Sequence, residues 1–95
     1  MFFSIITVVL NDLENLKKTI ENVEKQSCQD YEYIIVDGCS KDGTINYLQE
    51  LSAKDTKIRY ISEKDTGIYN AMNKGISLAR GEYILFLGAG DFLYN

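Results

Sequence analysis

Apolar stretches alternate with amphipathic stretches along the 95 residues of this chain. Four runs rich in β-branched and aromatic residues predict buried strands, at residues 2–10, 31–36, 57–62 and 83–87. Between the strands, apolar residues recur every three or four positions, which predicts three helices, the last over residues 68–80. The side chains expected to face the core are Leu13, Leu16, Ile20 and Val23 in the first helix, Ile45, Leu48 and Leu51 in the second, and Met72, Ile76 and Ala79 in the third.

The ends and order of these elements predict the fold class. Asn11 or Asp12 can cap the first helix, and Gly81 is expected to end the third helix in a left-handed conformation. The β-α-β-α-β-α-β order predicts one α/β domain with an open, mainly parallel, Rossmann-like sheet and flanking helices. The last strand has a bare edge, so we expect residues 1–95 to be the N-terminal part of a larger domain. Such an edge can also pair with a second copy of the chain, giving a homo-oligomer.

Charge and cysteine content exclude several classes of protein. The net charge is −4 and the ten Lys and Arg residues are scattered, which argues against nucleic-acid partners. The longest apolar run, Ile5 to Leu10, is far shorter than the roughly 20 residues of a membrane helix. Residues 1–4 lack the basic start of a signal peptide. Cys28 and Cys39, without any histidine, argue against a zinc site or a disulfide scaffold, and two reduced cysteines fit a cytoplasmic protein.

Two acidic residues follow predicted strands and are candidates for ligand binding. Asp37 ends the second strand, and Asp91 follows the fourth strand through Gly88-Ala89-Gly90. Open α/β sheets bind ligands outside the carboxyl ends of their strands, where Asp37 can accept a hydrogen bond from a ribose or a base N–H. Asp91 can offer a hard oxygen to Mg²⁺ or Mn²⁺. Either residue can instead be a capping residue of its turn.

Other nucleotide-binding patterns are absent from the sequence. A dinucleotide-binding Rossmann domain needs a glycine-rich turn after its first strand, and the segment from Thr7 to Asp12 contains no glycine. No GxxxxGK[ST] phosphate loop is present, and Asn11-Asp12 is a weak imitation of the acidic pair of a receiver domain. Cys39 lacks an evident base or cationic partner, so we interpret it as a loop residue rather than a nucleophile.

Four segments together resemble family 2 glycosyltransferases with the GT-A fold. They are Ser4–Asn11, Ile35–Thr44, Glu63–Ile76 and Ala79–Leu87, and they follow the order and spacing of that family across nearly the whole chain. Each segment alone is a weak signal, whereas four in sequence are a specific one. One departure is that Gly88 and Gly90 stand where other members carry acids.

The resemblance implies a role for each candidate residue. The nucleoside would be held at the end of the first strand and by Asp37, which would face the base, whereas the start and last turn of the third helix would shape the diphosphate and sugar region. The implied nucleotide-binding residues are Thr7, Val8, Val9, Asn11, Asp37, Asp65, Gly67, Asn73 and Lys74, and the implied metal ligand, for Mg²⁺ or Mn²⁺, is Asp91. Read from the residues alone, Lys74 can equally be a solvated side chain.

The resemblance also implies a reaction. The family transfers a sugar, with inversion, from a nucleoside-diphosphate donor, and a UDP-sugar is the default donor while GDP- and dTDP-sugars stay open. The acceptor would be a glycan or a lipid-linked glycan of a bacterial-type surface polysaccharide, and the enzyme would be cytoplasmic or peripheral to the inner face of the membrane. The general base is expected beyond residue 95, so the 95 residues alone are expected to be inactive. The alternative is a non-catalytic nucleotide-binding or assembly module of the same fold.

Overall fold

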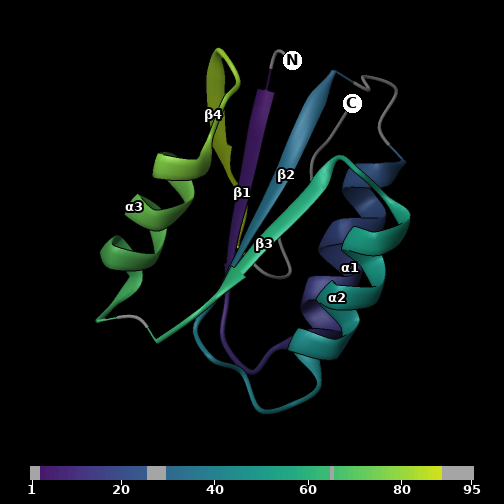
Figure 1. The fold of residues 1–95 in the computed structure, drawn as a ribbon, viewed down its shortest axis with the longest axis vertical. Coiled ribbons are helices and arrows are strands. Elements are labelled where there is room, and N and C mark those ends of the chain that lie inside the picture. Colours follow the sequence, from purple (N-terminus) through teal and green to yellow (C-terminus); the bar gives the residue numbers. More distant parts are fainter. Residues whose placement is uncertain (1–2, 26–29, 65, 89–95) are drawn as a thin grey trace.

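The computed structural model describes residues 3–25, 30–64 and 66–88. In these ranges the chain forms β1 (Phe3–Val9), α1 (Leu13–Glu24), β2 (Tyr31–Asp37), α2 (Thr44–Lys54), β3 (Ile58–Ser62), α3 (Ile68–Leu78) and β4 (Tyr83–Phe86). All strand pairs are parallel, and the sheet order is β3-β2-β1-β4 (Figure 1). The predicted α/β fold, element order and parallel sheet are therefore confirmed.

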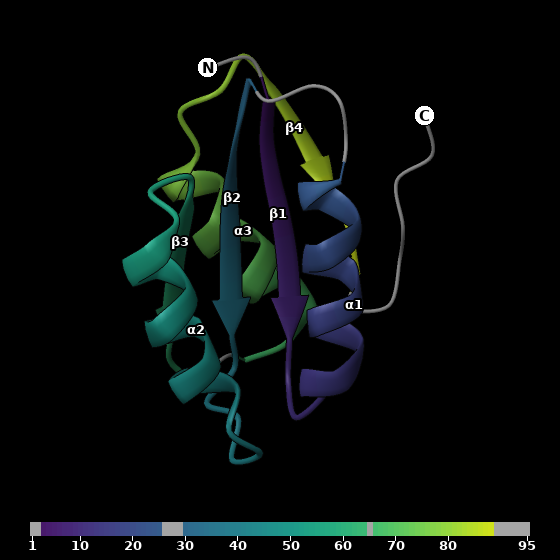
Figure 2. The ribbon, with the colours of Figure 1, turned by 90° about the vertical axis from the view of Figure 1, so that its right-hand side faces the viewer.

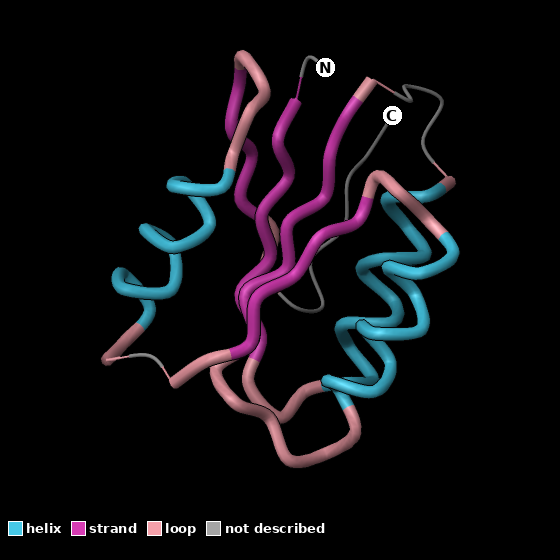
Figure 3. Tube along the Cα trace, viewed as in Figure 1, coloured by secondary structure: helices cyan, strands magenta, loops and turns pink. Residues whose placement is uncertain are grey.

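The helices cover the sheet from both sides. Figures 1 and 2 show α1 and α2 on one face and α3 on the opposite face, with the tube in Figure 3 making the three layers visible. The chain steps outward from β1 to β2 and β3, then passes through α3 to β4 on the far side of β1. β1 is therefore an inner strand, with β2 on one side and β4 on the other. The direction in which the chain adds strands reverses at β1.

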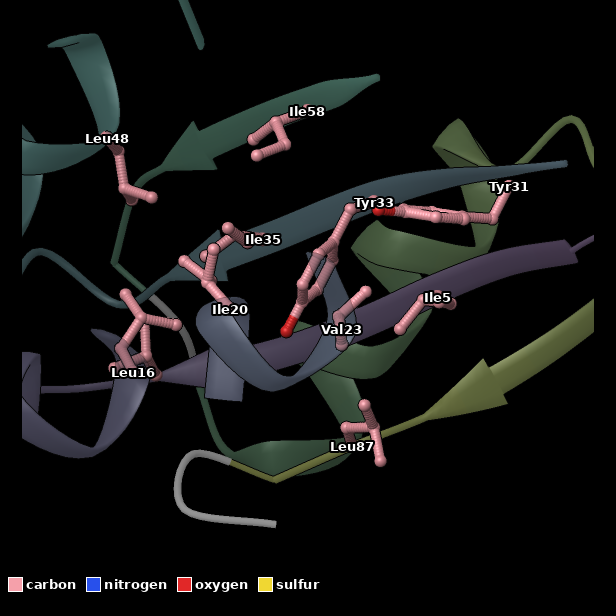
Figure 4. Close-up of a cluster of buried hydrophobic side chains, with 11 residues drawn as sticks. Ile5, Leu16, Ile20, Val23, Tyr31, Tyr33, Ile35, Leu48, Ile58 and Leu87 are labelled. Atoms are coloured by element: carbon pink, nitrogen blue, oxygen red, sulfur yellow. The ribbon is translucent and has the colours of Figure 1, made fainter. Parts of the chain in front are cut away.

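The larger core lies between the sheet and the α1–α2 pair (Figure 4). Of the predicted inward positions of α1 and α2, Leu16, Ile20, Val23 and Leu48 are buried. The other three, Leu13, Ile45 and Leu51, are half-buried. Each fully buried aliphatic side chain contributes about 1.5–3 kcal/mol by leaving water. Tyr33 lies in the same cluster, and burial raises the pKa of its hydroxyl above the usual value, so it stays neutral there.

The inward face of α3 differs from the prediction. Ala71 and Gly75 are buried against the sheet, whereas Ile76, expected in the core, is 43% exposed. A Cβ added to Gly75 would stand 2.6 Å from Ile6 Cγ2, so the helix approaches β1 through its smallest residues. Ala79 packs as expected against a second, smaller core, made of Ile6, Ile34, Val36 and Ala71. The prediction placed Ile76 inward by the helical spacing of apolar residues, but the close approach of helix and sheet puts the small residues there instead.

Gly81 has a different role from the one its sequence position suggests. α3 ends at Leu78 with an extended Ala79, and Gly81 is not among the glycines with a positive φ. Its missing side chain matters because an added Cβ would lie 2.7 Å from the backbone of Phe3 and Ser4. The left-handed helix stop was therefore wrong, and close backbone packing against β1 explains the glycine.

A buried polar network ties the amino-terminal ends of the strands together. Glu32 in β2 accepts hydrogen bonds from Ser4 Oγ at 2.6 Å, Arg59 Nη2 at 2.6 Å and the Arg80 N–H at 2.5 Å. Burial raises the pKa of Glu32, but the bonds from Ser4, Arg80 and Arg59 outweigh it and lower that pKa below the usual value. The Ser4 hydroxyl also accepts the Gly81 N–H at 2.7 Å. The network thus fixes the segment that leads into β4 at the amino-terminal ends of the strands.

Among the described residues, no helix is long and apolar enough to cross a membrane.

Candidate functional site

The candidate site lies at the carboxyl edge of the sheet. Val9, Asp37 and Ser62 stand side by side in register at the ends of β1, β2 and β3. The connection after β1 leads toward β2, whereas β4 lies on the other side of β1. In open α/β sheets such a reversal of strand order opens a crevice outside the strand ends, where ligands bind.

The Asp37 carboxylate is wholly buried at this edge, with 0% of the residue exposed. One oxygen accepts the Ser40 N–H at 3.0 Å and the Ser62 hydroxyl at 2.7 Å, and the other accepts the Ser40 hydroxyl. These three hydrogen bonds compensate the charge of the carboxylate, as burial of a carboxylate requires. The backbone carbonyl of Asp37 also accepts the Glu63 N–H at 3.0 Å.

The loops after β1 and β2 are bound to each other through Ser40. The Asn11 N–H donates to Ser40 Oγ at 2.8 Å, and Asn11 Oδ1 accepts the Lys41 N–H at 2.7 Å. Because Ser40 Oγ also donates to Asp37, a continuous path runs from the end of β2 to the loop after β1. Both loops line the same edge of the sheet.

Two residues of these loops adopt left-handed backbone conformations. Asn11 has φ 49° and Cys39 has φ 68°, values that non-glycine residues seldom adopt, with Asn the more tolerant of the two. Cys39 is an exposed free thiol, and Leu10 beside Asn11 is 60% exposed. We call the loop residues 10–11 and 39–40 the rim of the site. The hydrogen bonds through Ser40 hold the rim, which exposes Leu10 and Cys39 to solvent.

Asp42 caps two helices at once. Its carboxylate accepts the Leu13 N–H at the start of α1 at 3.0 Å and the Thr44 N–H at the start of α2 at 3.2 Å. The Thr44 hydroxyl also donates to it at 2.5 Å, and this bond is the main cause that lowers the pKa of Asp42. Asp12, which the sequence nominated as a cap, bonds Asn15 Nδ2 instead, and Asn11 bonds Lys41. Asp12 therefore holds the predicted N-cap position of α1, but its side chain makes no capping bond, and that bond comes from a loop 29 residues away.

The predicted residues of β1 turn most of their side chains away from the edge. Thr7 is buried and its hydroxyl bonds the Tyr33 hydroxyl at 2.6 Å, Val9 is buried in the same core, and Val8 packs on the α3 face. A nucleoside at this strand end would therefore meet the backbone of β1 and the side chain of Asn11 rather than Thr7. Their roles in nucleotide binding stay predictions.

The remaining predicted residues belong to α3 and the segment before it, on the opposite face of the sheet. Gly67 precedes the first turn of α3, which begins where the strands end (Figure 1). Asn73 is exposed, whereas the Lys74 ammonium pairs with Glu63 at 3.1 Å and donates to the Lys64 carbonyl at 3.0 Å. Lys74 therefore ties α3 to the segment after β3, and an anion would have to compete with these partners. Asp65 lies outside the described residues.

The metal prediction concerns a residue that the structure does not describe. Asp91 lies outside the described ranges. Within those ranges, no group of three or more His, Cys, Asp and Glu side chains is arranged to hold a metal ion.

Ser40, Ser62 and Asp42 are the residues of this edge that sequence reasoning missed. Asp side chains in turns commonly accept hydrogen bonds from backbone N–H groups a few residues on, so the Asp37–Ser40 contact is of a kind that local sequence can suggest. The bond from Ser62 joins residues 25 positions apart, and no local signal announces it.

Comparison with known proteins identifies the family. The chain matches Glycosyl transferase family 2 over residues 4–94, and it belongs to this family. It is 42% identical over 95 residues to a PGL/p-HBAD biosynthesis glycosyltransferase of Mycobacterium bovis, covering 98% of this chain and 37% of that protein. It is 37% identical over 89 residues to the putative teichuronic acid biosynthesis glycosyltransferase TuaG of Bacillus subtilis, covering 93% of this chain and 35% of that protein. The chain thus spans little more than a third of these relatives.

Solved structures confirm the GT-A fold. TarS of S. aureus, in complex with UDP-GlcNAc, superposes with a TM-score of 0.86 at 24% identity, over 97% of this chain and 27% of its own. The mannosyltransferase PcManGT of Pyrobaculum calidifontis, in complex with GDP-Man and Mn²⁺, gives 0.85 at 21% identity, over 95% and 28%. The fold expected from the resemblance is therefore confirmed.

Proposed function

We propose that residues 1–95 form the donor-binding part of a glycosyltransferase that takes its sugar from a nucleoside-diphosphate donor. The observation that carries the proposal is the carboxyl edge of the sheet, where the loops after β1 and β2 meet beside the reversal of strand order in a family 2 chain. The nucleoside would lie at the ends of β1 and β2, and the diphosphate would lie toward the amino end of α3. Relatives of the same fold that were solved with UDP-GlcNAc and GDP-Man support a donor of this class.

The chemistry of such a transfer demands charge stabilisation at the departing diphosphate. Asp91 would be this chain's ligand for Mg²⁺ or Mn²⁺, because hard divalent cations prefer carboxylate, phosphate and water oxygens. The cation would neutralise charge on the leaving group. The Mn²⁺ in the PcManGT complex supports this choice of cofactor. The described residues would contribute by binding and orienting the nucleoside, not by exchanging protons with the acceptor.

The acceptor side of the reaction is proposed to lie beyond residue 95. Inversion needs a general base that activates the acceptor hydroxyl, and the chain spans 37% of its first relatives, so that residue would belong to the remaining two thirds. We propose a glycan or lipid-linked acceptor, a UDP-sugar as default donor, and a cytoplasmic site of action, peripheral to the membrane in the full-length enzyme. The naming of TuaG for teichuronic acid biosynthesis supports a surface polysaccharide product.

Nucleotide binding is the direct test, and Cys39 offers a probe within the candidate site. In a Cys28→Ser background, alkylation reports on Cys39, which is exposed and free. Saturating UDP, GDP or dTDP, each with and without Mn²⁺, should slow alkylation of Cys39, with one base preferred. Inorganic phosphate without any nucleoside is the matched control, and it should leave the alkylation rate of Cys39 unchanged. If every nucleotide left the alkylation rate at its nucleotide-free value, in protein with a folded circular dichroism spectrum, the proposal would be contradicted.

A non-catalytic binding or assembly module of the same fold is the second candidate. The bare edge of β4 favours it, since Tyr83, Ile84, Leu85 and Phe86 are all exposed in the described structure. Product release separates the two candidates. If the full-length protein that contains residues 1–95 is an enzyme, it liberates nucleoside diphosphate from the donor when acceptor is present. A protein that binds the nucleotide and never turns it over would be the module.

A further inference from the structure

Asp37 is the acid that the family resemblance places against the base, yet its carboxylate faces into the protein. It is 0% exposed, and it ends β2 between Val9 of β1 and Ser62 of β3. None of the residue is exposed, so a base could bond this carboxylate only if the protein groups around it moved. Charge-assisted hydrogen bonds to a buried carboxylate are the strong ones, so a movement that broke one of them would be unfavourable.

The donors to Asp37 divide into two kinds. The Ser62 hydroxyl, at 2.7 Å, comes from β3 and anchors the carboxylate to the sheet. Ser40 donates both its N–H, at 3.0 Å, and its hydroxyl, and it belongs to the loop that forms the rim. Only the Ser40 bonds continue into the loop after β1, through Asn11.

Ser40 passes the restraint on to the neighbouring loop. Its hydroxyl oxygen accepts the Asn11 N–H at 2.8 Å, and the Asn11 side chain accepts the Lys41 N–H at 2.7 Å. Asn11 and Cys39 both have left-handed backbones, which the chain abandons readily unless other contacts hold them. The path from Asp37 through Ser40 to Asn11 is such a set of contacts. We call these three residues the rim lock.

We propose that Asp37 is a positioning residue, which acts on nucleotide binding through the rim lock rather than by touching the nucleoside. Its carboxylate holds Ser40, and Ser40 holds Asn11, so that the exposed Leu10 and Cys39 on either side are kept in one arrangement before the ligand arrives. A rim already ordered in the free protein spares the nucleotide the cost of ordering it. The inference rests on the proposed function, because it concerns the same nucleotide site.

A double-mutant cycle on nucleotide affinity tests the lock. Asp37→Asn and Ser40→Ala should each weaken binding of UDP, GDP and dTDP by about tenfold and by similar factors for the three bases. The double variant should bind about as weakly as the weaker single variant, since both changes open the same path. Ser62→Ala is the matched control: it removes a bond to the same carboxylate but leaves Ser40 on Asn11, so its loss of affinity should be clearly smaller than that of Ser40→Ala.

Three outcomes would overturn the proposal. Additive losses in the double variant, or a loss confined to Asp37→Asn with a changed base preference, would mean that Asp37 contacts the base itself. Equal losses in Ser40→Ala and Ser62→Ala would mean general loosening of the fold. Thermal unfolding of each variant is measured alongside, and Ser40→Ala keeps the cycle informative where Asp37→Asn fails to fold.

Amide hydrogen exchange in the ligand-free protein separates this inference from the proposed function. Ser40→Ala should speed exchange at the Asn11 and Lys41 amides, whereas Ser62→Ala should speed it clearly less. A wild-type protein that binds no nucleotide would end the proposed function and the positioning role together, even with the exchange result as expected. Unchanged exchange in Ser40→Ala, with nucleotide binding intact, would overturn the lock alone.

Discussion

Replacing Gly75 with alanine should destabilise the protein, although the sequence alone predicts the reverse. In the interior of a helix, alanine is favoured over glycine by about 0.8–1.0 kcal/mol. Gly75 lies inside α3, so helix propensity would make Gly75→Ala a stabilising change. The tertiary structure decides otherwise, because the added Cβ points at β1.

The size of the effect follows from the contact that the new methyl group would make. It would lie 2.6 Å from Ile6 Cγ2 and 3.2 Å from Ile6 Cδ1, whereas carbon atoms pack best at about 3.5–4.0 Å. Ile6 is fully buried and cannot swing into solvent, so α3 must move by about 1 Å. Overpacking of this kind costs about 1–3 kcal/mol, and we take the upper end, which leaves a net loss of about 2 kcal/mol.

Urea unfolding followed by circular dichroism measures this loss, and thermal unfolding should show a midpoint lower by about 8–16 °C. Asn73→Ala is the matched control, because Asn73 is exposed in the same helix and alanine there should stabilise slightly through propensity. A Gly75→Ala protein as stable as the wild type would refute the reasoning and would mean that α3 does not pack against β1 as described.

Three further changes test other parts of the structure. Gly81→Ala should cost at least as much as Gly75→Ala, because its Cβ would meet the backbone of β1 and the Ser4 hydroxyl, and urea midpoints should rank the two. Glu32→Gln should lower the free energy of unfolding by about 3 kcal/mol, because Arg59 loses the charge of its buried partner and the new amide NH2 faces N–H and O–H donors. A loss below about 1 kcal/mol would contradict the network. The pKa of Asp42 is lowered by its bonds in the folded protein, so it stabilises the fold above its usual unfolded pKa of about 3.9. That contribution is lost as pH falls through the lower folded pKa, and Asp42→Asn should flatten this acid limb of the pH–stability profile.

The elements of this fold were predictable because their signals are local. The β-branched run of β1 and the helical spacing of Leu16, Ile20 and Val23 are properties of a few neighbouring residues, and both were confirmed. The likeness to family 2 glycosyltransferases rests on the same kind of information, because its segments are short stretches in a fixed order. The acid at the end of β2 was also found at the predicted edge of the sheet.

Contacts between distant residues decided what the sequence did not reveal. Asp42 caps a helix that begins 29 residues earlier, and Gly81 packs on Ser4 across 77 residues, so no local pattern could announce either role. The buried face of α3 follows from how closely the helix approaches β1, which Gly75 permits and side-chain hydrophobicity does not reveal. In the same way, the sequence identified Asp37 as the acid at the ligand edge, but only the packing of three strand ends turned its carboxylate toward Ser40 and Ser62. Local periodicity therefore determined the elements and their order. The tertiary structure alone decided which side chains contact one another, because a contact between distant residues depends on where the fold places both of them.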